Sequence, residues 1–293
     1  MIGSRFLELT ESDFAKQKKL LLSSKDLNLI TTKQAEIEAK FSDFKNHQLL
    51  HFAAYTDVDG AEAQSGDENG SCWQLNVEGT KKLAEVAKKL NLKMVYISTD
   101  FVFDGKTGPY SEEDEVENSE DGLSWYGWTK LIGERTVLET MGNFLIVRTS
   151  YPYRAKFAGK ADFVRNIIER LRSGNLYPMF YDQFFTPTLI DNFVASLDLL
   201  IKQNQAGIWH VVDNTTLSAY QAASEVAKVF AANPGKIQKA SVLEFQRENP
   251  KVAKRPVKGG LKNDKLRKFL AKFGKDTQGF SDALVEMKRQ VTR

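Results

Sequence analysis

The sequence predicts an α/β protein with a doubly wound parallel sheet and a smaller C-terminal lobe. Short apolar, β-branched runs alternate with longer segments whose apolar residues recur at helical spacing. The clearest short runs are 48–52, 94–97, 144–147 and 208–212. Two of these runs continue into polar residues, at 98–100 and 148–150. Because open α/β sheets bind ligands at the carboxyl ends of their strands, we expect the functional site there.

Length and composition indicate a globular protein with a large core. The chain has 293 residues, of which 42% are apolar and 11% aromatic, and this length suits one large domain or two interleaved ones. It contains no apolar run of about eighteen residues, and its N-terminus lacks the pattern of a signal peptide. Neither a membrane nor export is indicated, so a cytoplasmic location is expected.

Charge and cysteine content exclude several other classes of site. The formal net charge is only +3, and the basic excess gathers at 251–255 and 262–275. These basic residues form either a solvated face or a surface that attracts an anionic substrate. Binding of nucleic acid is the weaker interpretation. Cys72 is alone, which excludes an internal disulfide framework, and the three histidines show no ligand spacing. We therefore predict no metal site.

The stretch 93–130 contains the candidate chemistry. A buried strand is expected to end at Ser98-Thr99, and a polar loop over 104–124 leads to a helix that begins near Tyr126. Tyr126 and Lys130 are four residues apart, which places them on one helix face about 6 Å from each other. A nearby ammonium favours the phenolate and lowers a tyrosine pKa from about 10. A hydroxyl of Ser98 or Thr99 can bind the same substrate oxygen.

The Tyr-x-x-x-Lys spacing alone is weak, because roughly one such match is expected by chance in a chain with this composition. The alternative is a surface tyrosine beside a surface lysine. Context favours catalysis, since Tyr126 follows a buried strand that ends in hydroxyl residues.

These residues resemble those of a known family. A strand ending in Thr or Ser, followed by Tyr-x-x-x-Lys, is the pattern of extended short-chain dehydrogenase/reductases, which use NAD or NADP on nucleotide sugars. Residues 98–105, 109–112 and 126–134 resemble more narrowly those of the dTDP-4-dehydrorhamnose reductase family. The likeness covers most of the chain.

The resemblance implies an activity and a division of the chain. Residues 1–149 would form an N-terminally truncated, Rossmann-type NAD(P)-binding domain, and 150–293 mainly a substrate-binding lobe interleaved with the sheet. The implied reaction is hydride transfer from NAD(P)H to the 4-keto carbon of a dTDP-linked deoxysugar. Tyr126 would donate a proton, Thr99 would hydrogen-bond the same oxygen, and Lys130 would lower the Tyr126 pKa and hold the nicotinamide ribose. Asp100 would assist at the sugar.

The first residues depart from the family pattern. The spacing predicts a helix over 3–18 and a strand over 20–22, with no strand ahead of the helix. A dinucleotide-binding fold starts with a strand and a glycine-rich turn that holds the pyrophosphate. Only Gly3 remains of that turn, so Gly3 and Ser4 are the expected pyrophosphate contacts. The chain reads as though it begins inside its cofactor loop, through either a missed upstream start or a loss of the element.

Other cofactor contacts follow the next two predicted strands. Lys25 stands where dinucleotide folds read the ribose 2′ position, and it favours NADP without excluding NAD. Ala54, Tyr55 and Thr56 match a small-residue turn that approaches the cofactor in the family, although two adjacent alanines can equally serve packing. Asn76 resembles a family position that steadies the active site.

Substrate contacts are expected from the C-terminal lobe. The resemblance puts one at Tyr151, where tryptophan is more usual, against the alternative of a packed aromatic residue. Residues 182–188 match the family pattern Asp-Gln-x-x-x-Pro-Thr. Arg255 lies in an Arg-Pro turn like one that contributes to the nucleotide-sugar site in relatives. It can bind a phosphate through two parallel hydrogen bonds, or it can be a solvated surface residue.

Two alternatives remain open at this point, and a homodimer is possible. One alternative is another nucleotide-sugar enzyme, an epimerase or a 4,6-dehydratase, although a dehydratase would carry an Asp-Glu pair after Thr99, where Asp100-Phe101 stands. The other is a non-catalytic binding protein such as the regulatory subunit of methionine adenosyltransferase. The reduced glycine turn favours it, and the catalytic residues oppose it.

An apolar strand of about ten residues ending in Gly-x-x-Gly, placed ahead of Met1, is expected to raise stability and dinucleotide affinity together. Such a strand would pair buried backbone groups that each cost about 1–3 kcal/mol when unpaired, and its turn would supply amides to the pyrophosphate. Denaturant unfolding and titration with NADPH and NADH, on the chain with and without the extension, test this. Tight binding by the unextended chain, with no gain from the extension, would contradict it.

Overall fold

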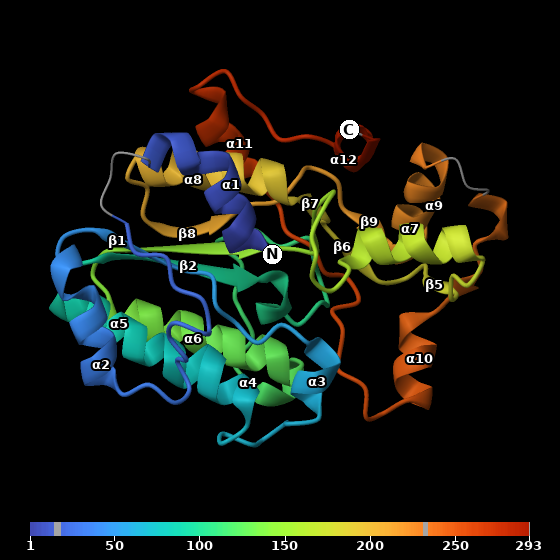
Figure 1. The fold of residues 1–293 in the computed structure, drawn as a ribbon. Coiled ribbons are helices and arrows are strands. Elements are labelled where there is room, and N and C mark those ends of the chain that lie inside the picture. Colours follow the sequence, from blue (N-terminus) through green and yellow to red (C-terminus); the bar gives the residue numbers. More distant parts are fainter. Residues whose placement is uncertain (15–18, 231–233, 293) are drawn as a thin grey trace.

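Four parallel strands form the central sheet of the computed structural model, which describes residues 1–14, 19–230 and 234–292 (Figure 1). Their order is β1-β2-β3-β8, with every neighbouring pair parallel. The strands are β1 (Gln48–His51), β2 (Lys93–Thr99), β3 (Phe144–Thr149) and β8 (Gly207–His210). All four coincide with the apolar runs that predicted them.

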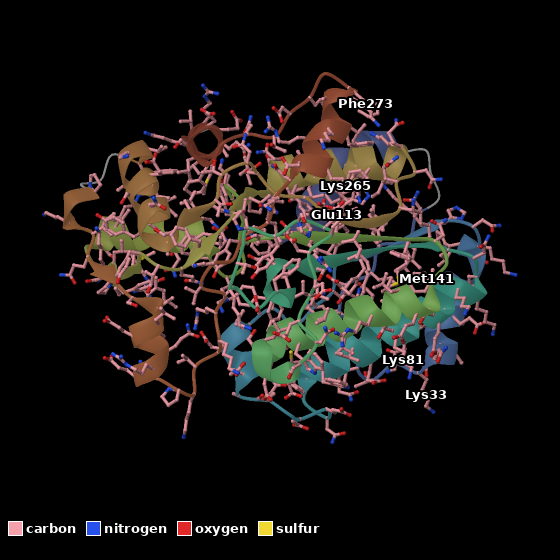
Figure 2. All side chains as sticks on the ribbon, turned by 180° about the vertical axis from the view of Figure 1, so that it is seen from behind. Lys33, Lys81, Glu113, Met141, Lys265 and Phe273 are labelled. Carbon is pink, nitrogen blue, oxygen red and sulfur yellow. The ribbon has the colours of Figure 1, made fainter. Side chains whose placement is uncertain are left out.

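Helices cover both faces of the sheet, which confirms the doubly wound architecture (Figure 1). One layer contains α2 (Gln34–Phe41), α5 (Gly79–Lys89) and α6 (Trp125–Thr140), and the other α1 (Ile2–Phe14), α8 (Ile190–Lys202) and α11 (Asp264–Ala271). Alternate residues of β2 supply the two cores, since Met94 and Tyr96 pack toward α5 while Val95 packs toward α8. Figure 2 shows Lys33 and Lys81 on the first layer and Lys265 and Phe273 on the second.

Helix α6 lies unusually close to β2, and two glycines permit this. Ser124 caps the helix by accepting a hydrogen bond from the Gly127 N–H. A Cβ at Gly127 would stand 2.3 Å from the Phe101 carbonyl oxygen, and one at Gly133 would stand 2.3 Å from the Tyr96 hydroxyl. The first turns of α6 are thereby held against the carboxyl end of the strand.

The C-terminal half builds a lobe beside this carboxyl edge (Figure 1). Its core joins α7 (Phe163–Ser173), α9 (Ala219–Val229) and α12 (Phe280–Thr292). Three two-stranded ladders connect it: β4 (Pro152–Tyr153) with β7 (Thr188–Leu189), β5 (Met179–Phe180) with β10 (Lys239–Ala240), and β6 (Phe184–Phe185) with β9 (Leu217–Ser218). Helix α10 (Val242–Glu248) follows β10. Because α8, β8 and α11 return to the sheet, the two halves interleave; the division at residue 149 stays a prediction.

Shorter elements fill the connections around the sheet. They are α3 (Val58–Glu62), α4 (Ser71–Trp73), a π-helical turn (Gln74–Glu78) and 3-10 turns at Ser42–Phe44, Asp100–Val102, Glu120–Gly122 and Pro234–Lys236. One helix is therefore continuous from α4 through the π-helical turn into α5. Within the described ranges, no helix is long and apolar enough to cross a bilayer.

The strand predicted over 20–22 is wrong. Residues 20–22 have no regular structure, and Leu20 and Leu21 are 38% and 55% exposed. A strand forms only with a hydrogen-bonded neighbour, and within the described part of the chain β1 pairs with β2 alone. The helix predicted over 3–18 is confirmed as far as Phe14, and 15–18 lie outside the described residues.

Candidate functional site

Two hydroxyl side chains meet where β2 ends. Thr99 is the last residue of the strand, and its side chain lies beside the Tyr126 phenol, in the first turn of α6, closely enough to act on the pKa of that phenol. Thr99 also donates to the Asp100 carboxylate over 3.1 Å. The Phe101 ring stands edge-on to Tyr126, with centroids 5.7 Å apart. The predicted juxtaposition of Thr99 and Tyr126 is therefore present.

The pKa of Tyr126 moves in the opposite direction from the one expected. Burial raises the pKa of the phenol most, and the nearby Asp100 carboxylate raises it further, while the neighbouring Thr99 hydroxyl opposes both. Lys130 is not among the groups that shift it. Tyr126 is consequently held protonated at neutral pH, which suits a proton donor better than a base.

The ammonium of Lys130 points to the strand. The side chain is 2% exposed, its Nζ donates to the Ile97 carbonyl oxygen over 2.7 Å, and it lies 4.0 Å from the centre of the Tyr96 ring. Burial lowers the pKa of Lys130 to about 7, although the Glu134 carboxylate opposes this shift. Spacing alone placed Lys130 on the correct helix face but not the direction of its charged end.

Asp100 anchors this site to the lobe. Its carboxylate accepts a hydrogen bond of 2.6 Å from Ser150, whose oxygen accepts a second bond from the Thr186 N–H. Burial raises the pKa of Asp100 to about 6, opposed by the hydrogen bonds from Ser150 and Thr99. The sequence analysis missed Ser150 and Thr186 as partners, although the pattern over 182–188 marked the segment.

Tyr151 lies near Asp100, whose charge acts on its phenol. Its backbone has a φ of +41°, a left-handed conformation that a non-glycine residue adopts only under strong packing constraint. Its ring stacks on Phe185 with centroids 4.0 Å apart, and its hydroxyl accepts a hydrogen bond from Gln183. Burial, then the Asp100 charge, raise the Tyr151 pKa. Tyr151 is thus a packed aromatic residue, and its contact with a substrate stays a prediction.

An ion pair links the lobe to α3 near Tyr151. Arg255 donates to both oxygens of the Asp59 carboxylate, at 2.8 and 2.9 Å. Both charges influence the pKa of the Tyr151 phenol, so the pair lies near Tyr151. Arg255 is therefore not simply solvated, and its partner Asp59 had no signal in the sequence.

The turn after β1 is held by Asn76. The Asn76 side chain accepts from the Tyr55 N–H over 2.8 Å and donates to the Tyr55 carbonyl and to Thr129 on α6. This fixes the turn that contains Ala54 and Thr56 relative to α6. The expectation that Asn76 steadies the site has a physical basis in these bonds.

The remaining cofactor candidates lie in two places. A Cβ at Gly3 would contact the Phe52 ring at 3.2 Å, so glycine lets the start of α1 approach the end of β1. Ser4 accepts a hydrogen bond from Arg154. Lys25 is exposed in the turn that follows 20–22, and no described contact joins it to the other site residues.

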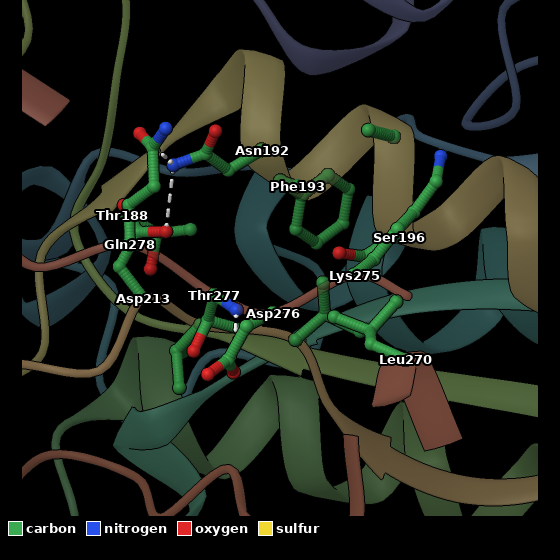
Figure 3. Close-up of a pocket in the computed structure, with 13 residues that line it drawn as sticks. Thr188, Asn192, Phe193, Ser196, Asp213, Leu270, Lys275, Asp276, Thr277 and Gln278 are labelled. Atoms are coloured by element: carbon green, nitrogen blue, oxygen red, sulfur yellow. Dashed lines mark hydrogen bonds between the residues drawn. The ribbon is translucent and has the colours of Figure 1, made fainter. Parts of the chain in front are cut away.

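A separate pocket lies between α8 and the segment before α12 (Figure 3). Asp213 accepts from Asn192, which also bonds Gln278, and burial raises the Asp213 pKa to about 7. The pocket residues tie the C-terminal segment to α8. Among the described residues, no three His, Cys, Asp or Glu side chains converge as metal ligands.

Comparison with known proteins assigns the family. The family model described as RmlD substrate binding domain matches residues 7–293. A dTDP-4-dehydrorhamnose reductase of Mycobacterium tuberculosis is 30% identical over 210 residues, 69% of this chain. The chain belongs to the dTDP-4-dehydrorhamnose reductase family. The resemblance inferred from the motifs is confirmed.

Other members and neighbours define the breadth of this family. The segment matched by the M. tuberculosis reductase spans 66% of that protein, just under two thirds of its length. Methionine adenosyltransferase 2 subunit beta of Xenopus laevis is 30% identical over 70% of this chain and 60% of its own. The crystal structure of a dTDP-4-dehydrorhamnose reductase from Clostridium acetobutylicum matches with a TM-score of 0.84 at 26% identity, covering 100% of this chain and 96% of that one. The Rossmann-type fold is thereby confirmed.

The lowered pKa of Lys130 should make the stability of the protein depend on pH. Its folded pKa of about 7 lies below the ordinary 10.5, so the unfolded chain holds more protons between these values and stability rises with pH across the window. From pH 7 to pH 9, the unfolding free energy of the wild type should therefore rise by about 2 kcal/mol relative to that of Lys130→Met. Urea unfolding at both pH values measures it. A difference that does not change with pH would mean that Lys130 stays charged when folded.

Proposed function

We propose that the protein is a reductase that transfers hydride from NAD(P)H to the keto carbon of a nucleotide-linked 4-keto-deoxysugar. The observation that carries this proposal is the meeting of the Thr99 and Tyr126 hydroxyls at the carboxyl end of β2. Family membership supports the same reaction, since several relatives are named dTDP-4-dehydrorhamnose reductase. NADP and NAD are both retained, because nothing in the site separates them.

The residues present fit a dinucleotide. The glycine at position 3 lets the start of α1 lie close to Phe52 at the end of β1, and the Asn76 bonds hold the turn at Tyr55. Within the described residues, Ser98 Oγ and Thr149 Oγ1 are buried at the same strand ends without a hydrogen-bond partner. Buried polar atoms of this kind are the exception in folded proteins, so they mark a place where a ligand can contribute. A bound nicotinamide would supply the hydride.

The chain's own residues handle the proton. Reduction of a ketone leaves a developing alkoxide, and Tyr126 donates its phenolic proton to that oxygen while Thr99 hydrogen-bonds it. The raised pKa keeps Tyr126 protonated until this transfer. Lys130, with a pKa of about 7, lies one turn along α6, and its Nζ, turned to the Ile97 carbonyl oxygen, is the group that would hold the nicotinamide ribose.

The lobe would bind the rest of the substrate. Tyr151 and Asp100 would contact the sugar, and Arg255, whose charge acts on the Tyr151 phenol, would contact the diphosphate. A guanidinium already bidentate to a carboxylate has the geometry to bind a phosphate in the same way. Residues 150–293 accordingly act mainly as the substrate-binding lobe, interleaved with the sheet.

The cellular setting belongs to the same proposal. We place the protein in the cytoplasm as an enzyme of nucleotide-sugar metabolism, with no nucleic-acid or membrane partner and with a homodimer as its possible assembly. A non-catalytic role is the alternative, supported by the similarity to methionine adenosyltransferase 2 subunit beta. An epimerase or dehydratase of the same fold is the other. The next experiment separates these alternatives from a reductase.

Tyr126→Phe should lower turnover of a dTDP-4-keto-deoxysugar with NADPH by a factor on the order of 10² or more, because only the proton donor is removed. Circular dichroism should show an intact fold. Tyr177→Phe, which removes the hydroxyl of an exposed tyrosine, is the control and should retain full activity. Equal rates for the Tyr126→Phe variant and wild type would remove Tyr126 from the mechanism, and no turnover by wild type would favour a binding role.

Arg255→Ala should raise KM for the nucleotide sugar much more than it lowers kcat, since a diphosphate contact exists in both ground and transition states. Asp59→Asn should lower KM, because it frees the guanidinium from its internal carboxylate. Arg267→Ala is the matched control, since Arg267 pairs with Asp276 on an exposed part of the protein. An unchanged KM in both the Arg255 and Asp59 variants would return the pair to a structural role.

A further inference from the structure

Arg154 is a buried cation aimed at the first turns of α1. It follows β4 in the lobe and is only 5% exposed. One guanidinium nitrogen donates to the Met1 carbonyl oxygen and to Ser4 Oγ, at 3.3 and 3.1 Å. The other donates to both oxygens of the Glu8 carboxylate, at 2.8 and 3.1 Å. No sequence pattern pointed to this residue.

Glu8 is the replaceable partner in this arrangement. Its side chain is 46% exposed, and an ion pair with one half-exposed member contributes little to stability. Glu8 also contacts Arg5 over 2.8 Å, but Arg5 has a second carboxylate, since it binds both oxygens of Asp191 at 2.6 and 2.7 Å. Release of Glu8 would therefore leave Arg5 paired and only Arg154 in need of an anion.

The loop that begins at Arg154 reaches from the start of α1 to the turn after β1. The Arg154 and Arg165 guanidinium groups lie near the Phe157 ring, at 5.4 and 5.8 Å. Arg165 donates to the carbonyl oxygens of Phe157 and Lys160 and so fixes the loop. Lys160 then stands 4.0 Å from Asp57, in the turn after β1. The loop thus brings two cations to the two segments, α1 and the β1 turn, between which the cofactor is expected.

We propose that Arg154 binds the diphosphate of the dinucleotide by exchanging the Glu8 carboxylate for a phosphate oxygen, with Lys160 turning from Asp57 to the same anion. This inference rests on the proposed function, because it presumes a dinucleotide between α1 and β1. The start of α1 contributes free backbone N–H groups and the positive end of its dipole, so an anion there is favoured twice. The lobe would then supply cofactor affinity as well as substrate contacts.

The purely structural alternative makes a different prediction for Glu8. If Arg154 only ties the lobe to α1, loss of the Glu8 charge weakens that tie and leaves dinucleotide binding unchanged or weaker. If Arg154 exchanges partners, loss of the Glu8 charge removes its competitor and one repulsive charge near the diphosphate, so binding tightens. Whether loss of the Glu8 charge tightens or weakens dinucleotide binding therefore separates the two roles.

The test is titration of NADPH into the full chain, followed by its fluorescence. Glu8→Gln should tighten the dissociation constant about threefold to tenfold, as expected for a unit charge removed several ångströms from the diphosphate. Arg154→Met should weaken it about tenfold or more, and the exposed Lys160→Met should weaken it by a smaller factor. Glu38→Gln, which removes a carboxylate paired with Lys89 on the α2–α5 layer, is the control and should have no effect.

A second ligand pair locates the effect on the diphosphate. ADP-ribose should show the same ratios across the variants as NADPH, whereas adenosine, which lacks the diphosphate, should show none. If Glu8→Gln binds NADPH no more tightly than Glu38→Gln, or if Lys160→Met and Arg154→Met both bind as wild type, the exchange is wrong. If wild type binds neither NADPH nor NADH, the proposed reductase function fails together with this inference.

Discussion

The buried ion pair between Arg148 and Glu134 is the constraint on which the candidate site depends. The two side chains are almost fully buried, and the guanidinium binds the carboxylate through bonds of 2.6 and 2.9 Å. Removing one member would leave an unpaired buried charge, a loss of about 3–5 kcal/mol. The pair fixes α6 against β3 at one rotation and one register. Tyr126 and Lys130 lie about two turns and one turn before Glu134 on that helix, so the pair also sets where they meet β2.

The parts of the structure that the sequence predicted are those determined by local spacing. The apolar run of β2 and the four-residue step from Tyr126 to Lys130 each depend on neighbours within a few residues. The strand at 20–22 failed because a strand also needs a partner in space, which hydrophobicity does not supply. Asp59 and Arg255 were not predicted as a pair because they are 196 residues apart and meet only after the lobe has docked.

The directions of side chains and of pKa shifts could not be predicted from the sequence either. Sequence spacing fixes the separation of Cβ atoms on α6, but Lys130 is long enough to turn its ammonium to the Ile97 carbonyl instead of Tyr126. The pKa of Tyr126 then follows burial and the Asp100 charge, and both raise it. Burial of a group depends on elements from the whole chain, so even a correct pair of catalytic candidates leaves the sign of the shift undetermined.

Two ion pairs between the lobe and the sheet side share one arrangement. Each of two lobe arginines, Arg154 and Arg255, binds a carboxylate on the sheet side, Glu8 and Asp59. The arginines are largely buried, while the carboxylates are 46% and 59% exposed, so the carboxylates can return to water at low cost and the guanidinium groups cannot. An anion bound between lobe and sheet would replace the carboxylates and keep the arginines paired. Under the two proposals above, the contacts that hold lobe and sheet together would exchange for contacts to a phosphate, and this would couple the lobe's attachment to the binding of phosphate-bearing ligands.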